Sequence, residues 1–168
     1  MLHVSDLSFR HGQRVLFDRA SAAFSDGWKV GLVGRNGAGK STLLKLIQGQ
    51  MEADGGEINL MGRTRIGSVP QDPPGGEITV LDAVLAADLE RSALLAESEA
   101  CHDGLRLAEI HARLDEIGAS SAPSRAASIL NGLGFDNEKQ SRPCGEFSGG
   151  WRMRVALAGT LFSDPDLL

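Results

Sequence analysis

The sequence predicts a mixed α/β fold of the phosphate-binding kind, with an antiparallel β patch at its start and an inserted helical hairpin. Three observations lead to this fold class. A continuous apolar run, a glycine-rich loop and a helical pattern follow one another over residues 28–47, and this order is the βα unit of such folds. Short alternating segments precede the unit, and helical periodicity dominates from residue 79 onward.

Length and composition limit the possible architectures. A chain of 168 residues predicts one domain, or one domain with a small insertion. Hydrophobic residues make up 42% of the chain, enough for a core, but the longest unbroken apolar run is far too short to cross a bilayer. The first residues lack the basic and apolar regions of a signal peptide. We therefore expect a cytoplasmic protein without direct membrane insertion.

Charge and cysteine content argue against two classes of site. The net charge of −5 gives no electrostatic reason for this segment to bind nucleic acid. The whole excess lies between residues 86 and 120, where eight acidic residues stand against three arginines. Cys101 and Cys144 are far apart and the four histidines are scattered, so free thiols are favoured over a disulfide or a metal site.

The first 27 residues show the pattern of antiparallel β structure. Residues 2–9 alternate apolar and polar side chains, as a half-buried strand does. A turn is predicted at residues 11–13, and two further short strands at residues 15–17 and 20–24. Asp26-Gly27 then predicts a hairpin-type turn that closes this patch.

A different pattern follows. Residues 28–33 are nearly continuously apolar, which is typical of a parallel strand that is buried on both faces. After the glycine-rich loop, residues 41–47 have the apolar spacing of a helix that ends at Gly49. Two more strands are predicted at residues 57–60 and 65–69, and the composition of residues 72–76 predicts a loop.

Helical periodicity marks the region from residue 80 to residue 120. Two apolar faces repeat at helical spacing: Leu81, Val84, Leu85 and Leu89, and then Leu107, Ile110, Leu114 and Ile117. Residues 101–104 supply a break between them, so we interpret residues 80–120 as an antiparallel hairpin inserted in a domain that covers residues 1–168. The alternative is two ordinary surface helices of a helical subdomain. A third helix, over residues 124–133, is expected to end at Gly134 with Phe135 beyond it.

The glycine-rich loop matches the pattern G-x-x-x-x-G-K-[ST] in full. Its glycines allow backbone N–H groups to point at phosphates, and the helix that follows directs its positive end to the same oxygens. Lys40 adds a point charge, and the hydroxyl of Ser41 is a ligand for Mg²⁺. The alternative is a glycine loop without a ligand. The candidate ATP-binding residues are Gly34, Asn36, Gly37, Ala38, Gly39, Lys40, Ser41 and Thr42.

A second helix start of the same kind lies near the end of the chain. Residues 145–154 open a helix that continues to Leu161. Ser148 is a credible N-cap, and Gly149 and Gly150 allow a ligand to approach the backbone closely. Taken alone this pattern is weak evidence, because such caps are common.

Together the two motifs resemble ATP-binding cassette domains, which have a P-loop NTPase fold. In that family the Walker A loop of one cassette and the signature of another enclose one ATP molecule. Here the signature is the run 147–151, which departs from the family pattern at its first and last positions. The resemblance implies that Gln71, in the run 69–72, contacts Mg²⁺ and the attacking water. It also implies that Phe9 and His11 lie where the family's aromatic residue stacks on adenine, with His11 at the aligned position in place of tyrosine.

Within the family the sequence is similar to the soluble ABC-F class. The runs 147–158 and 129–135 carry this likeness, and residues 80–120 resemble the arm of the class. The resemblance implies ATP and Mg²⁺ as ligands, a second cassette on the same chain, and action in translation at the ribosome. Because the arm is acidic, loop-tip contacts to ribosomal protein, or basic regions outside these 168 residues, would have to supply the attraction. The alternative is the nucleotide-binding subunit of a membrane transporter.

The sequence contains no counterpart of the family's Walker B aspartate or catalytic glutamate. Residues 164–168 correspond to the beginning of the strand that carries them. We therefore expect a fragment of an N-terminal cassette that belongs to an ATPase family but is inactive alone. If the 168 residues were the mature product, a nucleotide-sensing pseudoenzyme would be the third possibility.

Overall fold

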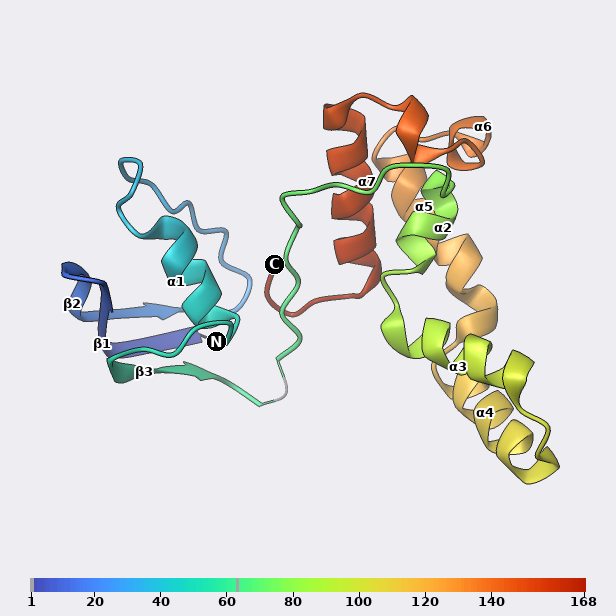
Figure 1. Cartoon of the computed structure of the whole chain (residues 1–168), viewed down its shortest axis with the longest axis horizontal. Coiled ribbons are helices and arrows are strands. Elements are labelled where there is room, and N and C mark those ends of the chain that lie inside the picture. Colours follow the sequence, from blue (N-terminus) through green and yellow to red (C-terminus); the bar gives the residue numbers. More distant parts are fainter. Residues whose placement is uncertain (1, 63) are drawn as a thin grey trace. The chain divides into compact units, whose positions relative to one another are not determined.

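The computed structural model describes residues 2–62 and 64–168 (Figure 1). The chain forms two compact units, Met1–Thr64 and Arg65–Leu168. The first unit holds an antiparallel sheet and the helix that follows the glycine-rich loop, and the second unit is helical. This division separates the two motifs that the sequence singles out, so each is described within its own unit.

The first unit is built on one sheet with the order β2-β1-β3. Its strands are β1 (Leu2–His11), β2 (Arg14–Phe24) and β3 (Gly55–Leu60), and both pairings are antiparallel. Helix α1 (Lys40–Ile47) lies over this sheet (Figure 1). The buried residues of β1 are Leu2, Val4, Leu7 and Phe9. The alternation that the sequence predicts holds on each side of a register shift between Val4 and Leu7. The predicted turn between β1 and β2 is present at Gly12-Gln13.

Strand β2 corrects the expectation of two short strands. It runs unbroken from Arg14 to Phe24, although its register with β1 shifts at three places. Hydroxyl groups accept hydrogen bonds from backbone N–H groups beside these irregularities: Ser21 Oγ from Asp6 N at 2.9 Å, and Ser8 Oγ from Arg19 N at 3.1 Å. β2 is therefore one strand that contains bulges. The polar residues 18–19 interrupt its apolar pattern, and two short strands were expected for that reason.

The expected buried strand at residues 28–33 is wrong for this structure. The segment forms no strand, and its apolar side chains are exposed, with Trp28 64% and Val33 89% accessible. A parallel strand needs a neighbouring strand and a layer on each face. Among residues 2–62 and 64–168 the sheet β2-β1-β3 is the one sheet present, and residues 28–33 do not pair with it. Continuous apolar character therefore could not by itself define a strand here.

The expected strand at residues 65–69 is also absent. One parallel bridge joins Ile66 to Leu167, and Gly67 N donates to Leu167 O at 2.7 Å. A Cβ on Gly67 would lie 2.8 Å from Pro165, so this chain crossing requires glycine. One bridge leaves most backbone groups of the segment without a ladder, which explains why it remains irregular.

The second unit packs helices around one hydrophobic core. Its α-helices are α2 (Val80–Leu85), α3 (Leu89–Ala100), α4 (Gly104–Glu116), α5 (Ala122–Gly132), α6 (Asn137–Gln140) and α7 (Gly149–Phe162). Two short 3-10 helices lie at Ala119–Ser121 and Cys144–Glu146. The core is formed mainly by α2, α5, α7 and the residues that join them, including Val84, Leu130, Phe135, Val155 and Phe162.

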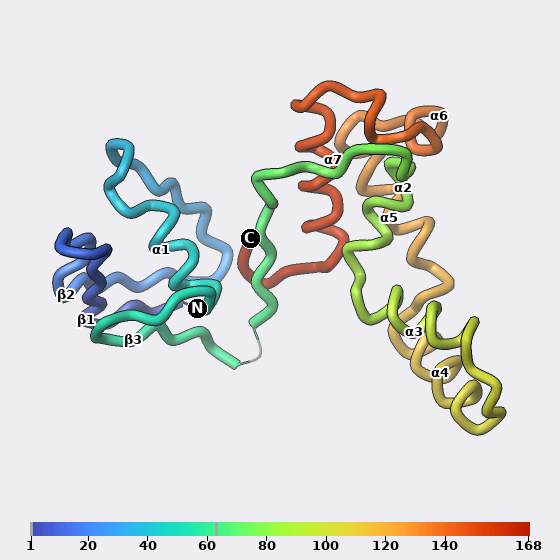
Figure 2. The backbone as a smooth tube through the Cα atoms, viewed as in Figure 1, coloured from blue at the N-terminus to red at the C-terminus, as the bar shows by residue number. Residues whose placement is uncertain are grey.

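Helices α3 and α4 form an antiparallel hairpin (Figure 2). Two ion pairs cross it: Arg106 Nε lies 2.7 Å from Glu97 Oε1, and Arg113 Nε lies 2.6 Å from Glu90 Oε1. The earlier residue of α3, Glu90, pairs with the later residue of α4, Arg113, and Glu97 pairs with the earlier Arg106. The two helices are therefore antiparallel. The predicted break at residues 101–104 is confirmed, as is the pairing of two helices. That this hairpin is an arm-like insertion stays a prediction.

The first apolar face of this region is not one helix. Helix α2 ends with Ala86 as its C-cap, and α3 begins as a separate helix with Asp88 as its N-cap. The Asp88 carboxylate accepts a hydrogen bond from Arg91 N at 2.9 Å, which satisfies a free donor of the first turn. A capping aspartate inside an apolar repeat therefore divided the segment into a core helix and a hairpin helix.

The ion pairs of the hairpin predict an acid-sensitive stability. The hydrogen bond from Arg106 lowers the pKa of Glu97, and partial burial opposes this effect. Because the folded-state pKa is lowered, the contribution of Glu97 is present above the unfolded-state pKa of about 4.3 and is lost as the pH falls through the folded-state value. We expect the melting temperature of the parent to fall more on acidification than that of a Glu97→Gln variant.

Circular dichroism melts near neutral pH and at about pH 3 would measure this difference. A Glu99→Gln variant is the matched control, because Glu99 is exposed on the same helix and forms no ion pair within the described ranges. Equal acid sensitivity in the two variants would show that the pair does not stabilise the hairpin.

The end of α5 confirms the predicted stop. Gly134 has a φ of 93°, a left-handed conformation that favours glycine. Gly134 N donates to Asn131 O at 3.1 Å and Phe135 N donates to Leu130 O at 3.0 Å. These two bonds form a Schellman motif. The turn directs Phe135 into the core, where its side chain is fully buried.

Candidate functional site

The glycine-rich loop of the first unit has the backbone conformation that its sequence predicts. Gly37 and Gly39 adopt φ values of 76° and 96°, which side-chain-bearing residues rarely adopt. Gly39 is the N-cap of α1, and its carbonyl accepts from Leu43 N at 2.8 Å. The loop therefore leads directly into the positive end of a helix, where free N–H groups favour an anion.

The side chain of Lys40 folds back onto the first residues of the loop. Its Nζ donates to Gly34 O at 2.7 Å and to Arg35 O at 2.9 Å. An ammonium group has three donors, so one remains available for a ligand in addition to these two. The carbonyl groups of Gly34 and Arg35 thus fix the ammonium group of Lys40 at the start of the loop.

Strand β2 supports the loop through residues that no sequence motif marks. A Cβ on Gly39 would lie 3.1 Å from Phe17 Cζ and 3.5 Å from Leu16 Cβ, so a side chain there would require Phe17 to shift slightly. A Cβ on Gly37 would lie 3.5 Å from Arg14 Nη1. These contacts join segments more than 20 residues apart, and sequence reasoning missed all three side chains.

The first turn of α1 carries the hydroxyl groups predicted to serve a metal. Ser41 is exposed and Thr42 is half-buried. Within the described ranges, the Ser41 hydroxyl makes no hydrogen bond. Mg²⁺ prefers oxygen ligands and normally completes its shell with water and phosphate oxygens, so a free hydroxyl at this position fits such an ion.

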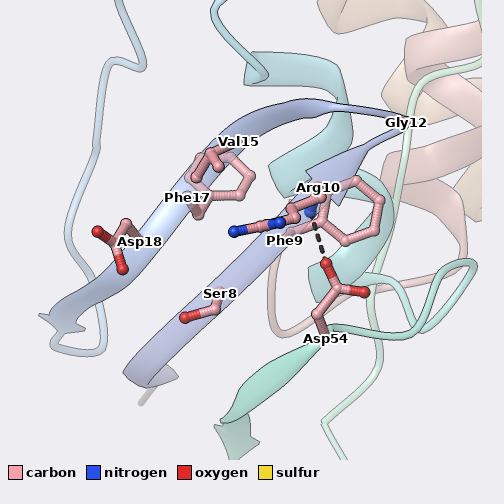
Figure 3. A pocket seen from close by; sticks show the side chains of 8 residues that line it. All are labelled: Ser8, Phe9, Arg10, Gly12, Val15, Phe17, Asp18 and Asp54. Atoms are coloured by element: carbon pink, nitrogen blue, oxygen red, sulfur yellow. Dashed lines mark hydrogen bonds between the residues drawn. The ribbon is translucent and has the colours of Figure 1, made fainter.

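His11 lies at the end of β1, exposed to solvent and opposite Arg14 in the register. A pocket of about 550 Å³ opens on the same hairpin (Figure 3). Its lining residues are Ser8, Phe9, Arg10, Gly12, Val15, Phe17, Asp18 and Asp54. The aromatic rings at this pocket are those of Phe9 and Phe17. His11 does not line it, so the role of His11 at adenine stays a prediction.

The second motif opens helix α7 in the helical unit. Ser148 occupies the N-cap position, but its side chain makes no capping hydrogen bond. Ser148 is therefore the N-cap that the sequence predicts, although its side chain makes no capping hydrogen bond. Ser148, Gly149 and Gly150 are all exposed, which leaves the hydroxyl and the first N–H groups of a helix of 14 residues accessible.

An aromatic cluster anchors this helix start. The rings of Trp151 and Phe135 pack edge-on with their centroids 4.9 Å apart, and the centroids of Phe147 and Phe135 are 5.6 Å apart. The Arg154 guanidinium lies 4.8 Å from the Trp151 ring centroid, a cation–π contact. Trp151 is therefore packed against the turn that ends α5.

The loop that carries Gln71 is tied to the segment before Ser148. Gln71 itself is exposed. Further along, Gly145 N donates to Gly76 O at 2.9 Å, and Cys144 N donates to Ile78 O at 2.8 Å. Burial raises the pKa of the Cys144 thiol, and the charge of Arg152 partly opposes this. The structure thus joins two predicted site segments that are about 70 residues apart in sequence.

The predicted residues therefore fall into two groups. Residues 34–42 form one continuous site in the first unit, while Gln71 and Ser148–Gly150 belong to the second. In the part of the chain that the structure describes, no three metal-ligating side chains gather into a cluster. The helices within that same part include none with the length and apolar character needed to cross a bilayer.

Comparison with known proteins relates the chain to one family. The family model described as "ABC transporter" matches residues 17–168. The probable ATP-binding protein YheS of Escherichia coli (strain K12) is 46% identical over 171 residues, which are 100% of this chain and 27% of YheS. Human ATP-binding cassette sub-family F member 3 is 42% identical over 174 residues, covering 97% of this chain and 23% of that protein. The chain thus spans about a quarter of the length of these relatives.

Solved structures show the same fold. The structure of an ATP-binding cassette of an ABC transporter in its ADP conformation has a TM-score of 0.72 at 22% identity, covering 98% of this chain and 65% of that one. A nucleotide-free cassette from an ABC transporter has a TM-score of 0.69 at 22% identity, with coverage of 98% and 66%.

Proposed function

The chain belongs to the ATP-binding cassette family, and from this premise we propose that it is the ATP-binding part of an ABC-F class ATPase that acts in translation at the ribosome. Relatives of that class match it at more than 40% identity. The proposal has three parts: binding of Mg-ATP at the glycine-rich loop, hydrolysis with a second cassette, and a cytoplasmic partner, the ribosome.

The observation that carries ATP binding is the position of Lys40. Its ammonium group is held by two loop carbonyls at 2.7 and 2.9 Å. The same loop contains the left-handed glycines Gly37 and Gly39, whose conformation can direct backbone N–H groups toward an anion. In our proposal Gly34, Asn36 and residues 37–40 bind the phosphates. Ser41 and Thr42 contribute hydroxyl groups. Ser41 is a proposed ligand of Mg²⁺, and so, from the family resemblance, is Gln71.

Replacing Lys40 by alanine tests this assignment. The substitution removes a charge-assisted contact worth roughly 1.5–3 kcal/mol, so ATP affinity should fall tenfold or more. Equilibrium titration with a fluorescent ATP analogue measures the change. The matched control is Lys45→Ala, because Lys45 is exposed in the last turn of the same helix. Equal affinity of the Lys40→Ala variant and the parent would rule out this site.

Hydrolysis in our proposal requires a facing cassette. The exposed Ser148 hydroxyl and the first N–H groups of α7 would bind the ATP held by the partner cassette. The free hydroxyl supports this role, because a capping hydrogen bond would have occupied it. Gln71 would orient the attacking water. Its loop is hydrogen-bonded to the segment that precedes Ser148, so both groups would respond together to the nucleotide.

The ribosomal role rests on the resemblance to the ABC-F class. A transporter subunit is expected to present a groove for a membrane-domain helix and to lack a long inserted hairpin, so the α3–α4 hairpin supports the ABC-F class if it is an arm-like insertion. Residues 86–120 contain eight acidic residues and three arginines. Of these arginines, Arg106 and Arg113 each contact two carboxylates. An acidic surface fits ribosomal protein better than RNA. Co-sedimentation of the chain with ribosomes, and its loss when residues 101–105 are replaced, would test this role.

A further inference from the structure

We propose that Arg14 is a second cationic ligand for the phosphates of the bound nucleotide, in addition to Lys40. This inference rests on the proposed ATP-binding function and concerns a residue outside the glycine-rich motif. Arg14 is the first residue of β2, directly after the Gly12-Gln13 turn. Its guanidinium lies near Gly37, one of the two left-handed glycines of the loop.

The geometry places the guanidinium at the loop. Arg14 Nη1 lies 3.5 Å from the point where a Cβ of Gly37 would stand. Because Gly37 has no side chain, the backbone of the loop stays open beside this guanidinium. A phosphate bound by the N–H groups around Gly37 would therefore lie within reach of an arginine side chain, which can offer two parallel donors to one phosphate.

The charges around Arg14 leave the guanidinium available. It forms no ion pair with any residue in 2–62 or 64–168. Residues 34–42 contain no acidic side chain that could compensate it. By contrast, Arg106 and Arg113 of the hairpin are each held by two carboxylates. An unpaired guanidinium at the loop would be stabilised by an anion that binds there.

A solvated surface arginine is the other explanation of an exposed residue at this position. Arg19 shows what that looks like on the same strand. Its side chain is 80% exposed and lies 3.9 Å from Asp18. Arg14 instead approaches the backbone of a loop more than 20 residues away. The difference between the two arginines provides a matched control.

The experiment compares Arg14→Gln, Arg14→Lys and Arg19→Gln in the full 168-residue chain. Affinity is measured for a fluorescent ATP analogue and, by competition, for inorganic tripolyphosphate, which has no base or sugar. We expect Arg14→Gln to weaken both ligands by about fivefold to tenfold and to reduce the salt dependence of binding. Arg14→Lys should retain part of the affinity, and Arg19→Gln should behave like the parent.

Three results would overturn the inference. If Arg14→Gln binds ATP as the parent does while Lys40→Ala does not, the loop binds ATP but Arg14 takes no part. If Arg14→Gln loses affinity for ATP but not for tripolyphosphate, the residue contacts the base or the sugar. If neither ligand binds the parent, the proposed ATP site fails together with this inference. A circular dichroism spectrum that matches the parent confirms that each variant is folded.

Discussion

A polypeptide of these 168 residues should release no phosphate in sustained turnover at saturating Mg-ATP. Phosphoryl transfer to water depends on a positioned metal ion, an oriented water and a group that positions or activates that water. Lys40, Ser41 and Gln71 can hold phosphates and metal. The 168 residues offer no aspartate or glutamate with the sequence context of the family's Walker B strand, and a missing general base alone costs about 10²–10⁴-fold in rate.

A phosphate-release assay on the purified chain is the measurement. The Lys40→Ala variant is the control, since it loses the proposed phosphate contact, and a circular dichroism spectrum checks that it is folded. Sustained turnover in the parent that disappears in Lys40→Ala would contradict the prediction, because it would show that another residue replaces the glutamate. Binding of the fluorescent ATP analogue without turnover would agree with it.

Replacing Phe135 by alanine should destabilise the helical unit by about 3–5 kcal/mol, the usual cost of removing a large aromatic side chain from a core. Phe135 is fully buried and contacts both Phe147 and Trp151 edge-on. It also closes the Schellman motif of α5 through its backbone N–H group. The substitution therefore leaves a cavity where the end of α5 meets the start of α7.

Urea unfolding followed by circular dichroism at the helical wavelengths measures this change in the free energy of unfolding. Leu105→Ala is the matched control, because Leu105 is a large apolar residue with 82% of its surface exposed. We expect the control to unfold as the parent does. Equal stability of Phe135→Ala and Leu105→Ala would show that the aromatic cluster does not hold this unit together.

The elements predicted correctly from sequence are those that nearby residues specify. The loop at Gly34–Ser41 follows from glycines at left-handed positions. The end of α5 follows from Gly134 and Phe135, which lie within one turn of that helix. The break of the hairpin at residues 101–104 follows from a cluster of polar residues and glycine. Each signal acts through backbone conformation or capping over a few residues.

The errors occurred where the outcome depended on distant partners. Residues 28–33 have the apolar character of a buried strand, yet a strand needs another strand beside it to form hydrogen bonds. Residues 65–69 gained one bridge, to Leu167, instead of a ladder. Strand β2 was divided wrongly because hydroxyl groups of β1 and β2 support its bulges.

By itself the sequence determined that the chain has a phosphate-binding loop before a helix, a second glycine-rich helix start, and a charged helical hairpin. Only the tertiary structure decided which side chains meet these motifs. It brought Arg14, Leu16 and Phe17 of β2 to the loop, and it packed Trp151 of the second motif against Phe135. The reason is physical: backbone motifs are encoded by neighbours in sequence, whereas packing and charge contacts are made between segments whose meeting depends on the whole fold.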